Sequence, residues 1–123
     1  MHPFEAFRTK REKGNEAVLK TDNLTIKRLF SLDKQTYNDG ALDKGTKELL
    51  GLVASTVLRC NDCIDYHLEQ AVKAGYTRAQ IDEALGVALL VGGSIVIPHL
   101  RHAAESLDFL YSEPSQTTPS RHE

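Results

Sequence analysis

The sequence predicts an all-α fold of about six helices, and three observations support this prediction. β-branched residues are scattered and never alternate strictly with polar residues, so the chain lacks a strand pattern. Apolar residues instead recur at helical spacing, in segments separated by capping residues and glycines. A chain of 123 residues also has the length of one domain, which buries enough surface to fold without covalent crosslinks.

Three helices are expected in the first half of the chain. The first runs from about Pro3 to Lys20, since proline is tolerated in the first turn of a helix. The second follows Asn23 and stops at the turn sequence NDG, and the third begins near Asp43. Residues at helical spacing support the last two: Ile26, Leu29, Phe30 and Tyr37 in the second, and Leu49, Leu52, Val53, Thr56 and Val57 in the third.

The fourth helix is expected to start within the sequence CNDC, because Asn61 or Asp62 can cap a helix N-terminus. It should end at Gly75, a residue type that readily adopts the left-handed backbone found after helix ends. Its expected buried positions are Ile64, Leu68, Ala71 and Val72. Both cysteines of the chain would therefore lie at the start of this helix.

The fifth helix opens at Thr77 and Gln80, which form a capping-box pair, and closes at Gly92 and Gly93. Its expected inward positions are Ile81, Ala84, Leu85, Ala88 and Leu89. The stretch ALGVALLVGG within it is apolar nearly all round, which indicates burial in a subunit interface as well as in a core. We therefore expect a homo-oligomer, with a central helix in a monomer as the alternative.

The sixth helix contains PHLRHAAESLDFLY, with Pro98 in its first turn. His99 and His102 share a face of this helix and could line a pocket or an interface, although a solvated or hydrogen-bonded pair is the commoner case. The domain is expected to span residues 1–111. The polar, proline-containing stretch 112–123 is expected to form a flexible tail.

Composition excludes several classes of function. The formal net charge is -2 and there is no tryptophan, so neither a basic nor an aromatic surface suited to nucleic acid or an anionic membrane is expected. The N-terminal stretch is too charged for a secretory signal, and the apolar runs are too short to span a membrane. A cytoplasmic location is therefore expected. In that reducing compartment a lone cysteine pair is more often catalytic or metal-binding than a structural disulfide.

The stretch RCNDCIDYHLEQ holds both cysteines and a histidine. Cysteine reacts as the thiolate, so its pKa decides its reactivity. Cys63 would lie near the positive end of the helix dipole, with His67 on the same helical face, and both features favour a thiolate. The negative charges of Asp62 and Asp65 oppose it. We expect Cys63 to be the ionised nucleophile and Cys60 to resolve its oxidised product as a disulfide.

Two alternative roles for the cysteine pair stay open. Cysteines are often simply buried, and two of them can fall at this spacing by chance. Cys60, Cys63 and His67 could also supply three ligands in a zinc-binding structural protein, but a closed zinc site needs a fourth ligand and the chain has no further cysteine. Redox chemistry is favoured, with no metal and no cofactor other than the redox-active cysteine pair itself.

The segment KELLGLVASTVLRCNDCIDYHLEQAVKAGYTRAQIDEALGVALLVGG resembles the carboxymuconolactone decarboxylase-like superfamily and, within it, the alkylhydroperoxidase D-like branch. The similarity covers roughly residues 40–110. Its motif is a glutamate twelve residues before a Cys-x-x-Cys pair, with a histidine four residues after the second cysteine. These residues are Glu48, Cys60, Cys63 and His67.

The resemblance implies an all-α fold that assembles as homotrimers or homohexamers. It also implies a peroxidase of antioxidant defence in which Cys63 attacks a hydroperoxide, Cys60 resolves the product, and Glu48 and His67 form a proton relay. A small dithiol or lipoyl-type reductant would then restore the thiols. The decarboxylases and lactone-acting members lack the thiol pair, so a non-redox enzyme acting on a lactone or a keto acid is the alternative.

One position departs from the family pattern. The best-known members have a relay histidine just before the second cysteine, where this chain has Asp62. This change lowers the expected peroxidase efficiency and makes general disulfide reduction a competing activity. Glu48 can approach His67 only if the third and fourth helices fold back antiparallel. Even then, Glu48 would lie somewhat beyond the level of His67, so that contact could need a bridging water. A surface glutamate at the start of a helix is the alternative.

Overall fold

The computed structural model describes residues 1–114, which contain six α-helices, one short 3-10 helix and no strand. The all-α prediction is therefore confirmed. The helices are α1 (Pro3–Leu19), α2 (Leu24–Thr36), α3 (Lys44–Val57), α4 (Asn61–Lys73), α5 (Arg78–Gly92) and α6 (Ile97–Ser112), with the 3-10 helix η1 (Ser94–Val96) between the last two. Most of the expected flexible tail, residues 115–123, lies outside the described part.

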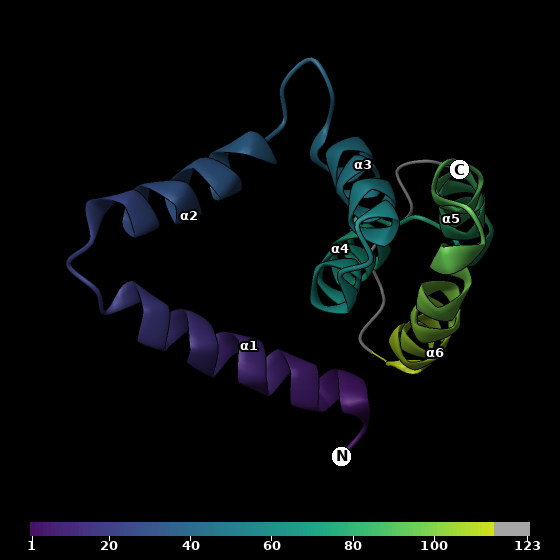
Figure 1. Cartoon of the computed structure of the whole chain (residues 1–123), viewed down its shortest axis with the longest axis horizontal. Coiled ribbons are helices and arrows are strands. Elements are labelled where there is room, and N and C mark those ends of the chain that lie inside the picture. Colours follow the sequence, from purple (N-terminus) through teal and green to yellow (C-terminus); the bar gives the residue numbers. More distant parts are fainter. Residues whose placement is uncertain (115–123) are drawn as a thin grey trace.

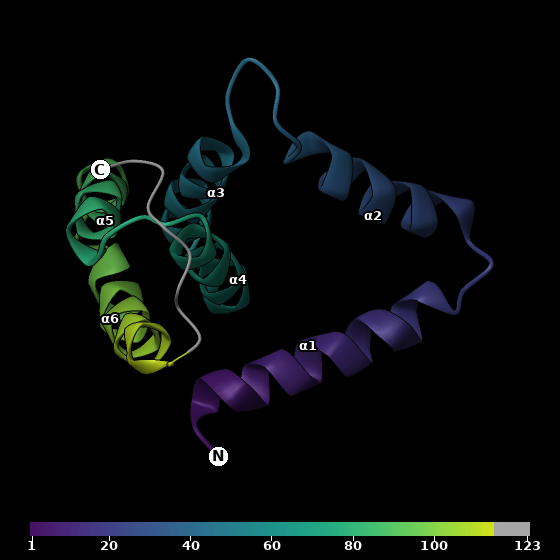
Figure 2. The same cartoon turned by 180° about the vertical axis from the view of Figure 1, so that it is seen from behind.

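Helices α3 to α6 form a compact body, and α1 and α2 form an arm that extends from it (Figure 1). Within the body α3 packs on both α4 and α5, and α4 packs on α6. The view from behind shows α2 set well apart from α5 and α6 (Figure 2). Helix α4, which carries the cysteines, is thus the element shared by α3 on one side and α6 on the other.

The core of the body is built around α4. Ile64 and Leu68 on this helix are completely buried, as are Leu52 of α3, Ile81 of α5 and Leu107 of α6. Burying one such aliphatic side chain contributes about 1.5–3 kcal/mol to the free energy of unfolding. The buried face of α4 matches the predicted one, since Ala71 and Val72 are buried as well. This packing fixes α4 firmly on its neighbours.

The first helix is held to the body at its N-terminal end. Phe4 lies in the hydrophobic core with 2% of its surface exposed. Arg8 forms two hydrogen bonds of 2.7 Å with the Glu113 carboxylate and an ion pair with Glu69 of α4. Ser112 ends α6, so neither Ser112 nor Glu113 belongs to a free tail. The start of α1 is therefore anchored both to α4 and to the residue that follows α6.

The second helix differs from the rest because none of its residues is buried. Leu24, Leu29 and Leu32 expose 60%, 64% and 59% of their surface. The predicted helical spacing of its apolar residues is present, but in the single chain this helix has no core to pack against. These three leucines therefore face outward along the arm, while Ile26 and Phe30 are half-buried.

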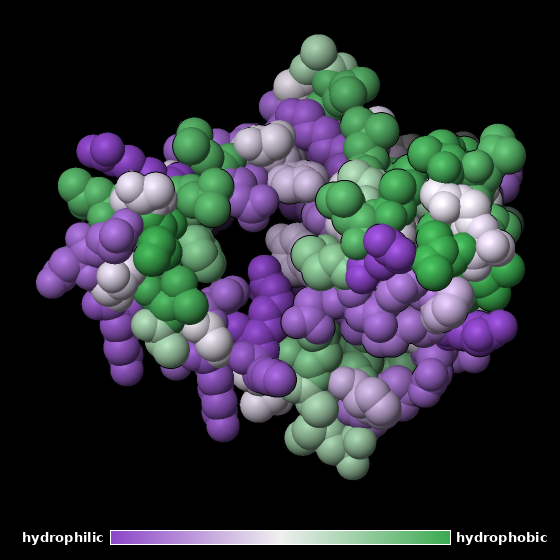
Figure 3. Space-filling model, in the orientation of Figure 1, coloured by the Kyte–Doolittle hydropathy of each residue, from purple (hydrophilic) through white to green (hydrophobic). Residues whose placement is uncertain are grey.

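A second apolar surface lies on the body. Val87, Leu90 and Val91 of α5 are exposed, together with Leu50 and Leu58 from α3 and its C-cap; we call these five residues the outer apolar face. They stand beside a groove of about 610 Å³ between α3 and α5 whose lining is almost wholly apolar. Figure 3 shows apolar residues gathered over this part of the body. In residues 1–114, no helix has both the length and the apolarity needed to cross a membrane.

Candidate functional site

The two cysteines lie at a sharp turn between α3 and α4. Arg59 follows the end of α3 with a φ of 63°, in the left-handed region that glycine occupies most readily. Its N–H donates to the carbonyl of Thr56, and the N–H of Cys60 donates to the carbonyl of Ser55. These bonds close α3 and reverse the chain. As a result, α4 begins immediately after Cys60.

Cys60, rather than Asn61 or Asp62, caps α4. The Sγ atom of Cys60 accepts a hydrogen bond of 3.3 Å from the backbone N–H of Cys63. The prediction of an Asn or Asp cap was wrong because the left-handed turn at Arg59 ends one residue earlier than expected. The first cysteine thus accepts a hydrogen bond from a backbone N–H group at the start of the helix. The bond also holds the two cysteines of the pair together.

The environment of Cys63 raises its pKa to about 11. Partial burial is the largest cause, followed by the interaction with Cys60 and by the negative charge of Asp62. This is opposite to the predicted stabilisation of a resting thiolate. The sequence left the balance between the helix end and the nearby acidic residues open, and in the structure burial, Cys60 and Asp62 outweigh the lowering effect of the backbone N–H. Ionisation of Cys63 therefore requires a base.

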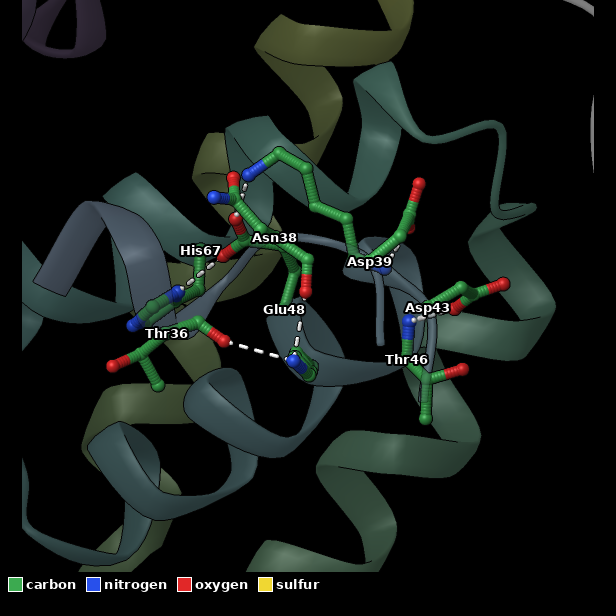
Figure 4. Close-up of polar contacts among 9 residues, drawn as sticks. Thr36, Asn38, Asp39, Asp43, Thr46, Glu48 and His67 are labelled. Atoms are coloured by element: carbon green, nitrogen blue, oxygen red, sulfur yellow. Dashed lines mark hydrogen bonds and ion pairs between the residues drawn. The ribbon is translucent and has the colours of Figure 1, made fainter. Parts of the chain in front are cut away.

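A buried carboxylate–imidazole pair joins α3 to α4 one helical turn after Cys63. Nδ1 of His67 on α4 lies 2.8 Å from Oε1 of Glu48 on α3, and Glu48 has no exposed surface (Figure 4). The predicted approach of Glu48 to His67 is confirmed, and the contact is direct, so no bridging water is needed. Because a carboxylate only accepts, Nδ1 carries the proton and Nε2 is left as the basic nitrogen.

Lys44 completes this pair. Its Nζ atom lies 2.7 Å from Oε2 of Glu48, so both carboxylate oxygens have a donor. Burial by itself raises the pKa of Glu48, but the hydrogen bonds from His67 and Lys44 outweigh it and bring the pKa below its usual value. Glu48 therefore stays ionised although it is buried, and it holds the imidazole in one orientation.

Gly51 makes the close approach of α3 and α4 possible. A Cβ atom at this position would lie 2.7 Å from Cε1 of His67 and 2.7 Å from Oη of Tyr37, too close for either side chain. The imidazole of His67 and the phenol of Tyr37 both occupy the space that this glycine leaves, with their ring centroids 5.5 Å apart. Neither Gly51 nor Tyr37 was predicted to belong to the site. The signal was a glycine one turn after Glu48 in an otherwise regular apolar helix.

Tyr37 is held in place by the α2–α3 connection. Lys47 of α3 donates to the backbone carbonyls of Thr36 and Asn38, at 2.9 and 2.8 Å, on either side of Tyr37 (Figure 4). Burial, together with the nearby charge of Glu48, raises the pKa of the Tyr37 phenol. It therefore stays protonated at neutral pH. This places a neutral O–H group next to the imidazole of His67.

A cavity of about 690 Å³ opens between the arm and the body. Open space between these two parts is visible in Figure 3. Its floor is α4, where Cys63 and His67 line it, and α1 forms the opposite wall. That wall includes Arg11, whose guanidinium lies 4.1 Å from the ring centroid of Tyr66. Of the predicted site residues, Cys63 and His67 thus face one shared space, with Glu48 behind His67.

The histidines of α6 have separate partners. Nδ1 of His99 lies 2.8 Å from the side chain of exposed Asn61, whereas Nε2 of His102 lies 2.9 Å from the buried carboxylate of Asp65. Both are hydrogen-bonded, as the commoner alternative had it, and His102 also lines the cavity with Cys63. In residues 1–114, no group of three His, Cys, Asp or Glu side chains has an arrangement that could hold a metal ion.

Comparison with known proteins shows the family. The sequence pattern of the carboxymuconolactone decarboxylase family matches residues 25–106, which is more than half of the chain. The chain belongs to the carboxymuconolactone decarboxylase family. It is also 37% identical over 79 residues to an uncharacterised protein of the cox locus of Paracoccus denitrificans, covering 64% of this chain and 71% of that protein.

Solved structures of family members agree with the fold. A carboxymuconolactone decarboxylase family protein of Thermotoga maritima, for which a role in the antioxidative response has been suggested, superimposes with a TM-score of 0.82. It is 54% identical, over 86% of this chain and 90% of that chain. A family protein of Legionella pneumophila gives a TM-score of 0.76 at 31% identity, over 90% and 96% of the two chains.

One relative carries the name of an activity. The alkyl hydroperoxide reductase AhpD of Corynebacterium kroppenstedtii is 34% identical over 64 residues. This match covers 52% of the present chain but only 37% of that protein. The chain is therefore similar to proteins of the AhpD type within the carboxymuconolactone decarboxylase family.

Proposed function

We propose that this protein is a thiol-dependent peroxidase and disulfide oxidoreductase of antioxidant defence, with Cys63 as nucleophile and Cys60 as resolving thiol. The observation that carries the proposal is the direct Glu48–His67 pair, because it supplies an oriented base in the cavity that Cys63 lines. Similarity to an alkyl hydroperoxide reductase and to a protein linked with the antioxidative response supports it. A reducing compartment such as the cytoplasm would supply the thiols.

The proposed reaction begins at Cys63. His67 takes the thiol proton at Nε2, and the resulting thiolate attacks the terminal oxygen of the hydroperoxide. The S–O bond forms as the O–O bond breaks, which yields a sulfenic acid on Cys63 and an alkoxide that takes up a proton to become an alcohol. The thiol of Cys60 then attacks this sulfur, water leaves, and the two cysteines are joined as a disulfide.

The catalytic cycle closes with a reductant. A small dithiol or a lipoyl-type cofactor of a partner attacks the Cys60–Cys63 disulfide and leaves as its own cyclic disulfide, so two electrons return to the protein. The carboxylate of Asp62 beside Cys63 raises the pKa of the thiol and slows the first step. Disulfide substrates whose leaving thiolates are stable would be less affected by that charge. The proposal therefore includes disulfide reduction next to hydroperoxide reduction.

The test is hydroperoxide consumption with a dithiol by the wild type, Cys63→Ser and Cys60→Ser. We expect Cys63→Ser to be inactive, and Cys60→Ser to undergo one oxidation to a sulfenic acid that dimedone traps, without forming the disulfide. Equal turnover by the wild type and Cys63→Ser would refute the assignment of the nucleophile. Activity on a lactone or a keto acid that survives loss of both cysteines would favour the non-redox alternative instead.

We further propose that the active form is a homotrimer or a homohexamer. The outer apolar face and the unburied leucines of α2 are apolar surfaces that a single chain leaves in water. Association would cover them and would bring the arm of each chain against a second copy. Light scattering at micromolar concentration checks this proposal, and a monomer under those conditions would refute it.

A further inference from the structure

A second carboxylate–imidazole pair lies on the other side of α4 and has no role in the steps above. Asp65 is 4% exposed and lies between α4 and α6. Ser106 donates a hydrogen bond of 2.6 Å to one of its carboxylate oxygens, and Nε2 of His102 lies 2.9 Å from the other. A buried carboxylate is costly unless its oxygens are hydrogen-bonded, and here each oxygen has its own partner.

His102 is the member of this pair that reaches the cavity. Its side chain keeps 32% of its surface exposed, and it lines the same space of about 690 Å³ as Cys63 and His67. Because Asp65 engages Nε2, the ring has Nδ1 for a further partner. Asp65 thus orients His102 much as Glu48 orients His67.

The two imidazoles approach the cavity from different sides. Residues two apart on a helix point about 200° away from each other, so His67 and Asp65 lie on opposite flanks of α4. His67 bonds to Glu48 of α3, whereas His102 of α6 bonds to Asp65. Cys63 belongs to the face of α4 that the cavity exposes between them. A substrate in the cavity therefore has one imidazole near the sulfur and a second one from the opposite helix.

We propose that His102, held by Asp65, donates the proton that the leaving oxygen of the hydroperoxide requires. This role rests on the proposed peroxidase function. In attack on a peroxide the sulfur, the attacked oxygen and the leaving oxygen lie in line, so the leaving oxygen is directed away from the sulfur and its base. The imidazolium of His102 loses a proton to the alkoxide, and the product alcohol leaves the protein with a neutral imidazole that solvent reprotonates.

The surroundings of Asp65 suit this role. Burial raises the pKa of Asp65 above its usual range, although the bonds from Ser106 and His102 act in the opposite direction. Asp65 therefore acts as the hydrogen-bond partner that fixes the His102 ring, while Ser106 holds the other carboxylate oxygen.

Dependence on the leaving group tests the role. Reduced His102→Gln is mixed with tert-butyl hydroperoxide, which leaves as a strongly basic alkoxide, or with peracetic acid, which leaves as acetate and needs no proton. Single-turnover oxidation of Cys63 is measured for both. We expect the rate with tert-butyl hydroperoxide to fall about 100-fold, the scale of general acid catalysis, and the rate with peracetic acid to change by less than about threefold.

Two further variants complete the experiment. His99→Gln alters a histidine one turn earlier on α6 whose partner is exposed Asn61, so it should leave both rates unchanged. Ser106→Ala keeps the imidazole but removes a donor to Asp65, and it should give a smaller loss with the same selectivity for tert-butyl hydroperoxide.

The outcomes separate this inference from the proposed function. An equal loss with both oxidants in His102→Gln would indicate a structural role and overturn the proposal, as would rates that match those of His99→Gln. A wild-type protein whose Cys63 reacts with neither oxidant would overturn the peroxidase function, and the role of His102 with it.

Discussion

The molecule contains two carboxylate–imidazole pairs that share α4 but differ in their third member. Lys44 lies beside Glu48, and the pKa of this carboxyl is below its usual value. A neutral hydroxyl, that of Ser106, lies beside Asp65, and the pKa of this carboxyl is above its usual value. Both carboxylates are buried, so burial alone does not decide their charge. The difference follows the neighbours of each carboxylate: Lys44 gives Glu48 a charged donor, whereas Asp65 has the neutral donor Ser106 and the negative charge of Asp62 nearby.

The two pairs also differ in what the shared helix contributes. Helix α4 supplies the imidazole of the first pair, His67, and the carboxylate of the second, Asp65. The first pair is therefore arranged to hold a base next to Cys63, one turn away on the same helix. The second pair extends an imidazole of α6 toward the cavity from outside α4. In the proposed mechanism, one helix thus contributes to two proton-transfer groups with different tasks.

Removing the charge of the first pair is expected to have the largest effect. Glu48→Gln keeps the shape of the side chain but cannot fix the tautomer of His67 or stabilise its charged form, so the rate of hydroperoxide reduction should fall about 100-fold. The measurement is kcat/KM with a dithiol. Glu83→Gln changes an exposed glutamate of α5 and serves as the control. An unchanged rate in Glu48→Gln would remove the base from the mechanism.

Distorting the first pair without changing its charges should have the next largest effect. In Gly51→Ala the new Cβ would meet His67 and Tyr37 at 2.7 Å, so these rings must shift. We expect a loss of about 1–3 kcal/mol in the free energy of unfolding, as for other overpacked sites, together with a lower peroxidase rate. Urea denaturation and the activity assay measure the two effects.

Gly86→Ala is the matched control for this substitution. It also replaces a helical glycine, but its Cβ would meet nothing within 4 Å. Because alanine is the better helix former, the free energy of unfolding of this variant should rise by about 0.5–1 kcal/mol. If both variants changed stability in the same direction, the close contact at Gly51 would not be the cause.

The fold could be predicted from the sequence because its signals are local. The capping box of Thr77 and Gln80 and the buried face of α4 depend on residues within one helix, and both are present as predicted. The direct bond between Glu48 and His67 could not be predicted in detail, since it depends on how closely α3 and α4 approach. Room for the His67 imidazole in this approach comes from Gly51, a residue whose contribution is the absence of a side chain.

The charge state of Cys63 was the main error of the sequence-based interpretation. Backbone N–H groups at a helix N-terminus do lower the pKa of a nearby thiol. How much they lower it depends on which sulfur accepts the N–H group, and here Sγ of Cys60 accepts it. The left-handed backbone at Arg59 makes Cys60 the cap and directs the N–H of Cys63 to it. The backbone conformation of one residue thus decides which residue caps the helix that carries both cysteines. No pattern of residue types around Arg59 indicates it.

Replacing the cation of the first pair tests the comparison directly. Glu48 stays ionised to a lower pH in the folded protein than in the unfolded chain, so it contributes stability at neutral pH that is lost as the pH falls through its folded pKa. Lys44→Met should raise this pKa, and the loss of stability on acidification should begin at a higher pH. The pH dependence that Asp65 contributes has the opposite sign. Its pKa is higher in the folded protein than in the unfolded chain, so the stability it contributes at low pH is lost as the pH rises.

Urea denaturation between pH 7 and pH 3 measures this effect, with Lys47→Met as the control. Lys47 lies on the same helix and bonds to the backbone carbonyls of Thr36 and Asn38, which do not titrate. Its loss should lower stability by a similar amount at every pH. Parallel pH curves for Lys44→Met and the wild type would show that Lys44 does not control the charge of Glu48.

The smallest expected effect concerns the turn that starts the shared helix. The two helix ends can be compared, since Gly75 follows α4 with a φ of 96° and Arg59 follows α3 with a φ of 63°. A left-handed backbone costs a residue with a side chain roughly 1–2 kcal/mol. Glycine avoids this cost, but it also has more conformational freedom in the unfolded chain. After both effects, Arg59→Gly should raise the free energy of unfolding by up to about 1 kcal/mol. Ala74→Gly, at the C-cap of α4 with an ordinary φ of -73°, should instead lower it. If Arg59→Gly were also less stable, the arginine side chain would have to stabilise the turn, and the start of α4 would depend on its charge as well as on its backbone.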